Sequence, residues 1–219
     1  MSGQDFSYSD LDEQDLSGKN LQNTNFVGGL LRGANLTAAD LRGANLSALL
    51  DEADFTDADL RGADLTGARL DKTDFTRADL IGAKLDRACY LSTAIWTNAR
   101  LDERWARVIQ ILQTVKEGQN LSNEDLRHIC IRVKLRQVNL QGANLQGSDL
   151  NSQNVSEANL RNTNLRDAVL RDANLSGTDL TGADLTGADL TGADLTGAVI
   201  SSEQLSTAKS IKEIVLSDK

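Results

Sequence analysis

A leucine or phenylalanine recurs at every fifth position along most of the chain. Runs of these apolar centres cover residues 6–46, 50–90 and 135–200. A small residue, most often alanine, stands two positions before each centre, and aspartate or asparagine usually stands between the two. A period of five matches neither the 3.6-residue period of a helix nor the two-residue alternation of a strand. The pattern predicts a short extended segment followed by a turn, repeated many times, with the centre and the small residue facing inward.

The glycines indicate where each turn lies. Fourteen of the seventeen glycines stand two positions after a centre, as Gly62, Gly142 and Gly187 do. A type II turn requires a positive φ at this place, which glycine adopts without steric cost. The chain contains no proline, and this suits a stack of paired turns because proline removes a backbone N–H.

The period breaks near the middle of the chain, where residues 102–117 have no five-residue phase. Their apolar positions follow the spacing of an amphipathic helix: Trp105, Val108, Ile109, Leu112 and Val115. The apolar stripe predicts that this helix packs over a coil end or a coil face, with Trp105, Ile109 and Leu112 in the interior. The opposite face carries Arg104, Arg107 and Gln110. A second interpretation is that this outer face is the surface that docks a partner.

Smaller breaks occur elsewhere in the repeat. The step from centre 46 to centre 50 is one residue short, and the step from 90 to 96 is one residue long. Between Leu126 and Leu135, either Cys130 or Ile131 is the centre, and the pattern does not decide between them. Near the C-terminus, Ser201 and Gln204 have the spacing of a capping box, which predicts a short helix over 201–208 that caps the last coil. The segment after it either adds a strand or forms a loose tail.

The pentads, most regular where Ala-Asp-Leu-Thr-Gly repeats over 179–198, resemble those of the pentapeptide-repeat proteins, and of cyanobacterial members in particular. The resemblance implies an all-β solenoid, a right-handed four-sided β-helix with four pentads in each coil. We therefore expect N-terminal coils over 1–101, a helical insertion over 102–118, C-terminal coils over 119–200, and a cap and tail over 201–219. Whether the two runs of coils stack continuously is left open by the sequence.

The implied coil length makes a prediction about the aromatic residues. Phe6 and Phe26 are twenty positions apart, and so are Phe55 and Phe75. With four pentads in each coil, each pair lies on one interior side, and we expect the rings to stack in neighbouring coils about 4.8 Å apart along the axis.

The charge of the chain bears on its partners. Thirty-two acidic and 23 basic residues give a formal net charge of −9, which argues against direct binding of nucleic acid. The resemblance raises a different hypothesis, because some pentapeptide-repeat proteins bind DNA gyrase as mimics of DNA. Four aspartates, 179, 184, 189 and 194, lie in successive pentads. They predict a ring around one coil, whereas a DNA mimic needs acids at twenty-residue spacing, as in the pairs 54 with 74 and 59 with 79.

The residues do not indicate catalysis. His128 is the single histidine, and Cys130 lies two positions away, but no third orienting group is evident. We therefore predict no enzyme, no cofactor and no metal site. The chain opens without a basic-then-apolar leader and has no apolar run long enough for a membrane span, which predicts a cytoplasmic protein without membrane contact. Cys89 and Cys130 are then expected to be free thiols.

Taken together, these observations favour a non-enzymatic structural scaffold that binds an unidentified protein partner. Modulation of gyrase or topoisomerase by DNA mimicry is the alternative. Because the first coil has no predicted cap, the expected assembly is a monomer or an end-to-end dimer.

Overall fold

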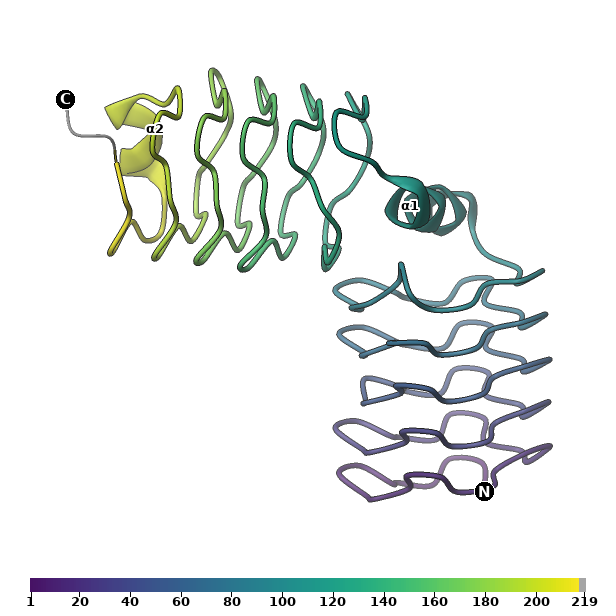
Figure 1. Cartoon of the computed structure of the whole chain (residues 1–219). Coiled ribbons are helices and arrows are strands. Elements are labelled where there is room, and N and C mark those ends of the chain that lie inside the picture. The colour runs from purple at the N-terminus through teal and green to yellow at the C-terminus, as the bar shows by residue number, and fades with distance from the viewer. Residues whose placement is uncertain (217–219) are drawn as a thin grey trace. The chain divides into compact units, whose positions relative to one another are not determined.

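The computed structural model describes residues 1–216. Most of them form successive coils built from five-residue repeats (Figure 1). Within these residues the coils are joined by isolated parallel β-bridges and not by longer strands. The first coil shows the register, because it pairs with the second at four places: Asp5 with Asn25, Asp10 with Leu30, Asp15 with Asn35 and Asn20 with Asp40. The bridged positions are five residues apart along the chain and pair with residues twenty further on.

The chain divides into two compact units, Met1–Gln113 and Thr114–Lys219. In the first unit the bridges run from Asp5 with Asn25 to Asp79 with Arg100. In the second they run from Asn120 with Asn139 to Asp194 with Val215. The two runs of coils that the sequence predicts thus fall in different compact units.

Hydrogen bonds explain why a five-residue period forms a coil. The centre donates its N–H to the next coil, as Phe26 does to the carbonyl of Asn45 at 2.8 Å. The residue before it donates back, as Asn25 N does to the carbonyl of Gln4 at 2.9 Å. The side chain of Asn25 closes the turn by accepting from Val27 N at 3.1 Å. Aspartate or asparagine at this position therefore satisfies a turn N–H that the ladder leaves unpaired.

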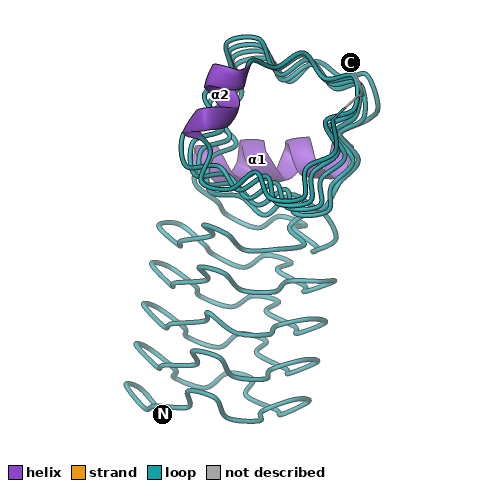
Figure 2. Cartoon of the chain, turned by 90° about the vertical axis from the view of Figure 1, so that its left-hand side faces the viewer, coloured by secondary structure: helices purple, strands orange, loops and turns teal. Residues whose placement is uncertain are grey.

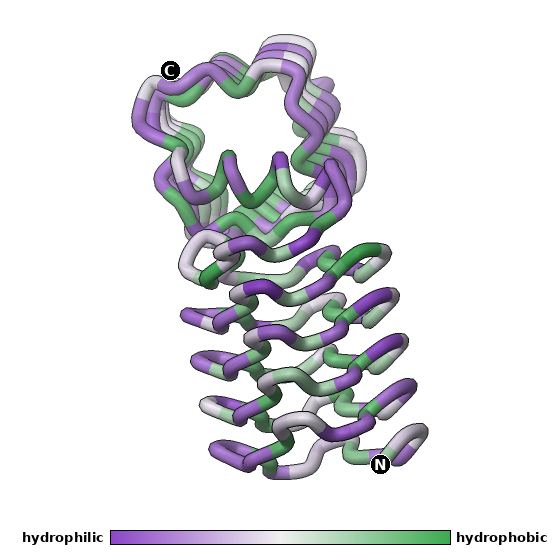
Figure 3. Tube along the Cα trace, turned by 90° about the vertical axis from the view of Figure 1, so that its right-hand side faces the viewer, coloured by the Kyte–Doolittle hydropathy of each residue, from purple (hydrophilic) through white to green (hydrophobic). Residues whose placement is uncertain are grey.

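The interior is a set of columns of leucine, phenylalanine and alanine, and the hydropathy of the trace alternates accordingly (Figure 3). The rings of Phe6 and Phe26 stack with centroids 5.7 Å apart, and those of Phe55 and Phe75 at 5.2 Å. Trp96 extends the second stack, with its ring 4.6 Å from that of Phe75. Phe6, in the first coil, is only half-buried, whereas the other three phenylalanines are fully buried.

The turn position is less dependent on glycine than the sequence indicates. Glycines there have positive φ, as Gly62 does at 67°. Within the described residues, however, twenty non-glycine residues also have positive φ, among them His128 at 54°. The ladder on both sides holds these turns, and it outweighs the local cost of a left-handed backbone.

Tyr90 is not an interior centre, contrary to the expectation from the period. Its φ is 67°, and the guanidinium of Arg69 lies 5.0 Å from its ring centroid on the outside. Leu91 takes the inward place and is 1% exposed. The extra residue in the step from 90 to 96 provides the length for this reversal.

The centre between Leu126 and Leu135 is Ile131. Cys130 forms the bridge with Asp149, which is the role of the residue before a centre. Ile131 N then donates to the carbonyl of Asp149 at 2.9 Å, as the centres of other pentads do.

Helix α1 spans Glu103–Thr114 and buries Trp105, Val108, Ile109, Ile111 and Leu112. Up to Gln113 the helix belongs to the first unit, where the guanidinium of Arg104 is 3.4 Å from the carboxylate of Asp86. Near its other end, Gln113 Nε2 donates to the carbonyl of Ala94 at 3.2 Å. The helix is shorter than the predicted 102–117, so Val115 lies beyond it. Ile111, outside the i, i+3, i+4 stripe, is buried although the pattern did not indicate it.

Helix α2, Ser202–Thr207, has the predicted capping box between Ser201 and Gln204. It does not cap the end of the coil, which corrects the expectation, because the chain pairs again after it at Ser210 and Val215. The helix instead replaces one pentad, and none of its residues is buried. Gln204 Nε2 donates to the carbonyls of Leu180 and Ala183 at 2.7 and 2.9 Å, in place of the backbone of a regular pentad. In Figure 2, α1 and α2 are the purple segments and the coils are drawn as teal loops.

The last residues of the predicted tail, 217–219, lie outside the described residues. Neither of the two helices within 1–216 has the length and apolar character needed to cross a membrane.

Candidate functional site

The outward residue before each centre forms a column along the coils, because bridges join these residues from one coil to the next. One column of the first unit contains Asn20, Asp40, Asp59, Asp79 and Arg100. The sequence identified Asp59 and Asp79 at twenty-residue spacing but missed Asp40. The short step between centres 46 and 50 places Asp40 nineteen residues before Asp59, so a search at a fixed spacing of twenty overlooks it.

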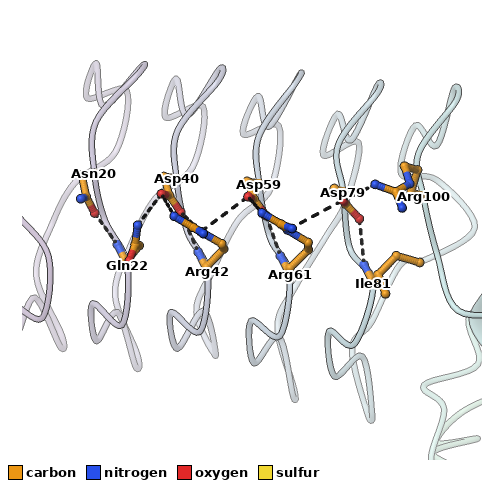
Figure 4. Close-up of polar contacts among 9 residues, drawn as sticks. All are labelled: Asn20, Gln22, Asp40, Arg42, Asp59, Arg61, Asp79, Ile81 and Arg100. Atoms are coloured by element: carbon orange, nitrogen blue, oxygen red, sulfur yellow. Dashed lines mark hydrogen bonds and ion pairs between the residues drawn. The ribbon is translucent and has the colours of Figure 1, made fainter.

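Arginines alternate with the three aspartates of this column and form what we call the charge ladder: Asp40, Arg42, Asp59, Arg61, Asp79 and Arg100 (Figure 4). Arg42 is 2.7 Å from Asp40 and 3.6 Å from Asp59. Arg61 repeats this geometry one coil later, 2.5 Å from Asp59 and 3.9 Å from Asp79. Arg100 ends the ladder 2.5 Å from Asp79.

The ladder changes the ionisation of its carboxylates. The hydrogen bond from the Arg42 side chain holds the pKa of Asp40 well below its usual range. The side chain of Arg61 lowers the pKa of Asp59 in the same way. Because Arg42 and Arg61 are about half exposed, at 46% and 51%, each ion pair contributes about 0–1 kcal/mol. The ladder therefore balances charge on this face and does not create an acidic stripe.

Replacing Asp59 with asparagine is expected to destabilise the protein by about 0.5 kcal/mol at low salt. Asparagine retains a side-chain acceptor for Arg61 N, which Asp59 binds at 3.2 Å, but it loses both arginine pairs. The matched control is Asp54→Asn, since the Asp54 carboxylate accepts from Thr56 N at 2.8 Å and forms no ion pair with an arginine within residues 1–216. Urea unfolding at about 0.05 and 1 M salt checks this. A difference between the variants that persists at high salt contradicts the electrostatic explanation.

The four aspartates at 179, 184, 189 and 194 surround a coil as the spacing predicts. Asp179 pairs with Val199, Asp189 with Ser210 and Asp194 with Val215, in three different columns. Three of the aspartates meet arginines of the preceding coil: Asp179 with Arg161 at 3.0 Å, Asp184 with Arg166 at 3.3 Å and Asp189 with Arg171 at 2.7 Å. The hydrogen bond from the Thr191 side chain lowers the pKa of Asp189, burial raises it, and Arg171 lowers it further. The net result is a pKa of about 2.

The structure separates the three residues proposed as a partner surface on α1. Arg104 pairs with Asp86, its side chain is 26% exposed, and its guanidinium lies 4.2 Å from the Trp105 ring centroid. Arg107 and Gln110 lie together, with Arg107 Nη1 donating to Gln110 Oε1 at 3.2 Å. Arg104 therefore has a packing role, and a partner-binding role for this face stays a prediction.

His128 and Cys130 have different surroundings. The His128 ring lies over the next turn, where a Cβ on Gly147 would stand 2.5 Å from Nδ1. The sulfur of Cys130 is 3.9 Å from Asp149 Oδ2. Within the described residues there is no free cysteine, so the expectation of free thiols is wrong.

A comparison with known proteins identifies the family to which the repeats are similar. A family model described as pentapeptide repeats matches in eight copies over residues 15–48, 53–89, 129–167 and 163–201. No curated protein matches the chain.

Several solved structures are similar. HetL, from the cyanobacterium Nostoc, is a pentapeptide repeat protein involved in the regulation of heterocyst differentiation. It is 30% identical over 98% of this chain and 84% of its own, with a TM-score of 0.30. QnrB1, a plasmid-mediated fluoroquinolone resistance protein, is 19% identical in a trypsin-treated form, over 93% and 90% of the chains, with a TM-score of 0.43. Rfr23, a pentapeptide repeat protein of the cyanobacterium Cyanothece, is 27% identical over 51% and 94%, with a TM-score of 0.25.

Proposed function

The chain belongs to the pentapeptide-repeat family, and from that premise we propose that it is a non-enzymatic scaffold whose coil faces bind a protein partner. We interpret the coils as a right-handed four-sided β-helix. The four bridges between the first two coils, five residues apart, support the four sides. A cytoplasmic location is part of the same proposal.

The observation that carries the proposal is the fixed spacing of the outward side chains. In the charge ladder, each aspartate is bridged through its backbone to the next coil, as Asp40 is to Asp59 and Asp59 to Asp79. Side chains on such a face keep their relative positions without a partner, so binding costs little conformational entropy. A periodic and pre-organised surface of this kind suits recognition of another protein.

The alternative, modulation of gyrase by DNA mimicry, is weakened by the arginines. The longest acidic column of the first unit, Asp40 to Asp79, carries an arginine partner at each aspartate. A mimic of DNA needs uncompensated negative charge at regular spacing. We expect the purified protein to leave the supercoiling activity of gyrase unchanged, and dose-dependent inhibition would restore this alternative.

The scaffold proposal is tested by affinity capture from a lysate of the source cells, followed by binding measurements with the purified partner. We expect a stoichiometric complex that forms with the isolated components. Arg107→Glu tests the outer face of α1, because Arg107 is exposed whereas Arg104 is half-buried and pairs with Asp86. Failure to reconstitute any complex from purified components contradicts the proposal.

A further inference from the structure

A second column of the first unit carries leucine where most pentads carry aspartate or asparagine. Its members are Asp10, Leu30, Leu49, Arg69 and Cys89. Leu30 and Leu49 lie in consecutive coils and face outward. Leu49 is 36% exposed, and Leu30 is half-buried. Outward leucines stacked in neighbouring coils form an apolar strip on an otherwise polar face, which is a feature of binding surfaces.

The apolar strip adjoins a hollow of about 410 Å³, which we call the Leu49 groove. Besides Leu49, its lining includes five acidic side chains and two arginines. Arg32 pairs with Asp12 at 2.9 Å, and Arg69 pairs with Asp51 at 2.7 Å. The lining therefore has a net charge of −3, which Glu13, Glu52 and Asp71 supply. Glu52 has a cation outside the lining, since Lys72 is 3.0 Å away.

The leucine and the arginine of this column also change the backbone. In a regular pentad the turn N–H donates to the aspartate two residues earlier, as Thr56 N does to Asp54 Oδ1 at 2.8 Å. Leu49 and Arg69 offer no such acceptor to the N–H groups of Asp51 and Asp71. Within residues 1–216, neither of these N–H groups has a protein acceptor. Two backbone donors in neighbouring coils are thus open to a ligand at the groove.

We propose that the Leu49 groove binds an extended, basic peptide segment of a partner protein, with an apolar side chain seated on Leu30 and Leu49. Lysine or arginine side chains of the segment meet Glu13 and Asp71, the two acids of the lining that remain after Arg32 pairs with Asp12, Arg69 with Asp51 and Lys72 with Glu52. Peptide carbonyls accept from the open N–H groups of Asp51 and Asp71. The inference rests on the proposed scaffold function and specifies the chemistry of the partner.

The test uses fluorescent peptides of roughly nine residues, long enough to cross several coils. Three peptides are compared by anisotropy on the full chain: one alternating lysine and leucine, one alternating lysine and serine, and one alternating glutamate and leucine. We expect the lysine–leucine peptide to bind at least about tenfold more tightly than either control, because only it satisfies both the strip and the acidic lining.

The decisive variant is Leu30→Asn/Leu49→Asn. It introduces a residue that regular pentads use at this position and adds a turn acceptor, so we expect the thermal midpoint to stay the same or rise. Affinity for the lysine–leucine peptide is expected to fall about tenfold. The control is Val169→Asn, which makes the same kind of change in a column of the second unit and leaves binding unchanged. If the double variant is unstable, Glu13→Gln/Asp71→Asn tests the same site, with the same expected loss.

Equal binding of the lysine–serine peptide, or undiminished binding by a folded groove variant, overturns the inference. The proposed function is judged separately. If a captured partner binds the groove variant as tightly as the wild type, the proposal for the Leu49 groove is wrong and the scaffold proposal is retained. If no complex is reconstituted but the three peptides bind with the expected order of affinity, the scaffold proposal is wrong and the Leu49 groove is retained as a peptide-binding site.

Discussion

Replacing Phe75 with alanine is expected to destabilise the first unit by about 3–5 kcal/mol. Phe75 is fully buried, and its ring stacks between those of Phe55 at 5.2 Å and Trp96 at 4.6 Å. The bridges on either side set the spacing of the coils, so the backbone has little freedom to close the void. Guanidinium unfolding followed by tryptophan fluorescence measures the effect, because Trp96 is in contact with the substituted position.

Two further variants separate cavity formation from a general loss of aromatic residues. Phe75→Leu is expected to cost less than about 1.5 kcal/mol, because leucine fills the same inward position in most pentads. Phe6→Ala is expected to cost less than Phe75→Ala, since Phe6 is half-buried and stacks on Phe26 alone. Equal effects of Phe6→Ala and Phe75→Ala would show that the stack does not confer the stability we assign to it.

Acid is expected to lower the stability of the protein by on the order of 2–3 kcal/mol between pH 4 and pH 2. Several outward aspartates have lowered pKa values. The hydrogen bond from the Thr191 side chain is the largest influence on the pKa of Asp189; burial opposes it and Arg171 reinforces it, so that the pKa is lowered to about 2 from 3.8. The Arg42 side chain is the largest cause of the lowered pKa of Asp40. A lowered pKa means that the unfolded chain binds more protons in this range. The stability that such an aspartate contributes is complete above pH 4 and is lost as the pH falls through the pKa of the aspartate in the folded protein.

Urea unfolding at pH 5, 3 and 2 measures this dependence. Asp189→Asn is the informative variant, because asparagine retains the acceptor for the turn and does not titrate. We expect its stability to be lower than that of the wild type at pH 5 and to depend less on pH. Asp54→Asn serves as a control without an arginine pair. A wild-type stability that stays constant from pH 5 to pH 2 contradicts the assignment of these pKa values.

Much of the coil was predictable, because its determinants are local and repeated. The alternation of inward and outward residues follows from a short extended segment, and the aspartate before each centre binds its own turn, as Asp54 does. The stacking of Phe55 on Phe75 followed from their spacing once four pentads were assigned to a coil. The helix over 103–114 was visible because its apolar stripe has a different period.

The charged surface was harder to predict. The sequence located the ring of aspartates around 179–194 but not the charge ladder, because the shortened pentad before Leu50 shifts one coil against the next by one residue. Tyr90 was assigned to the interior because the period continues through it. Only the path of the chain shows that the extra residue after it turns Tyr90 outward and Leu91 inward.

The sequence by itself determined the repeated coil, the inward columns and the places where the period breaks, because each depends on residues within one pentad or one helix. Only the tertiary structure decided which outward side chains meet across the shortened step between centres 46 and 50. Register between coils pairs Asp40 with Asp59 and stacks Leu30 on Leu49, and a one-residue change in a single pentad alters every pairing across that step. The charge ladder and the Leu49 groove depend on that register, because both are built from residues about twenty positions apart.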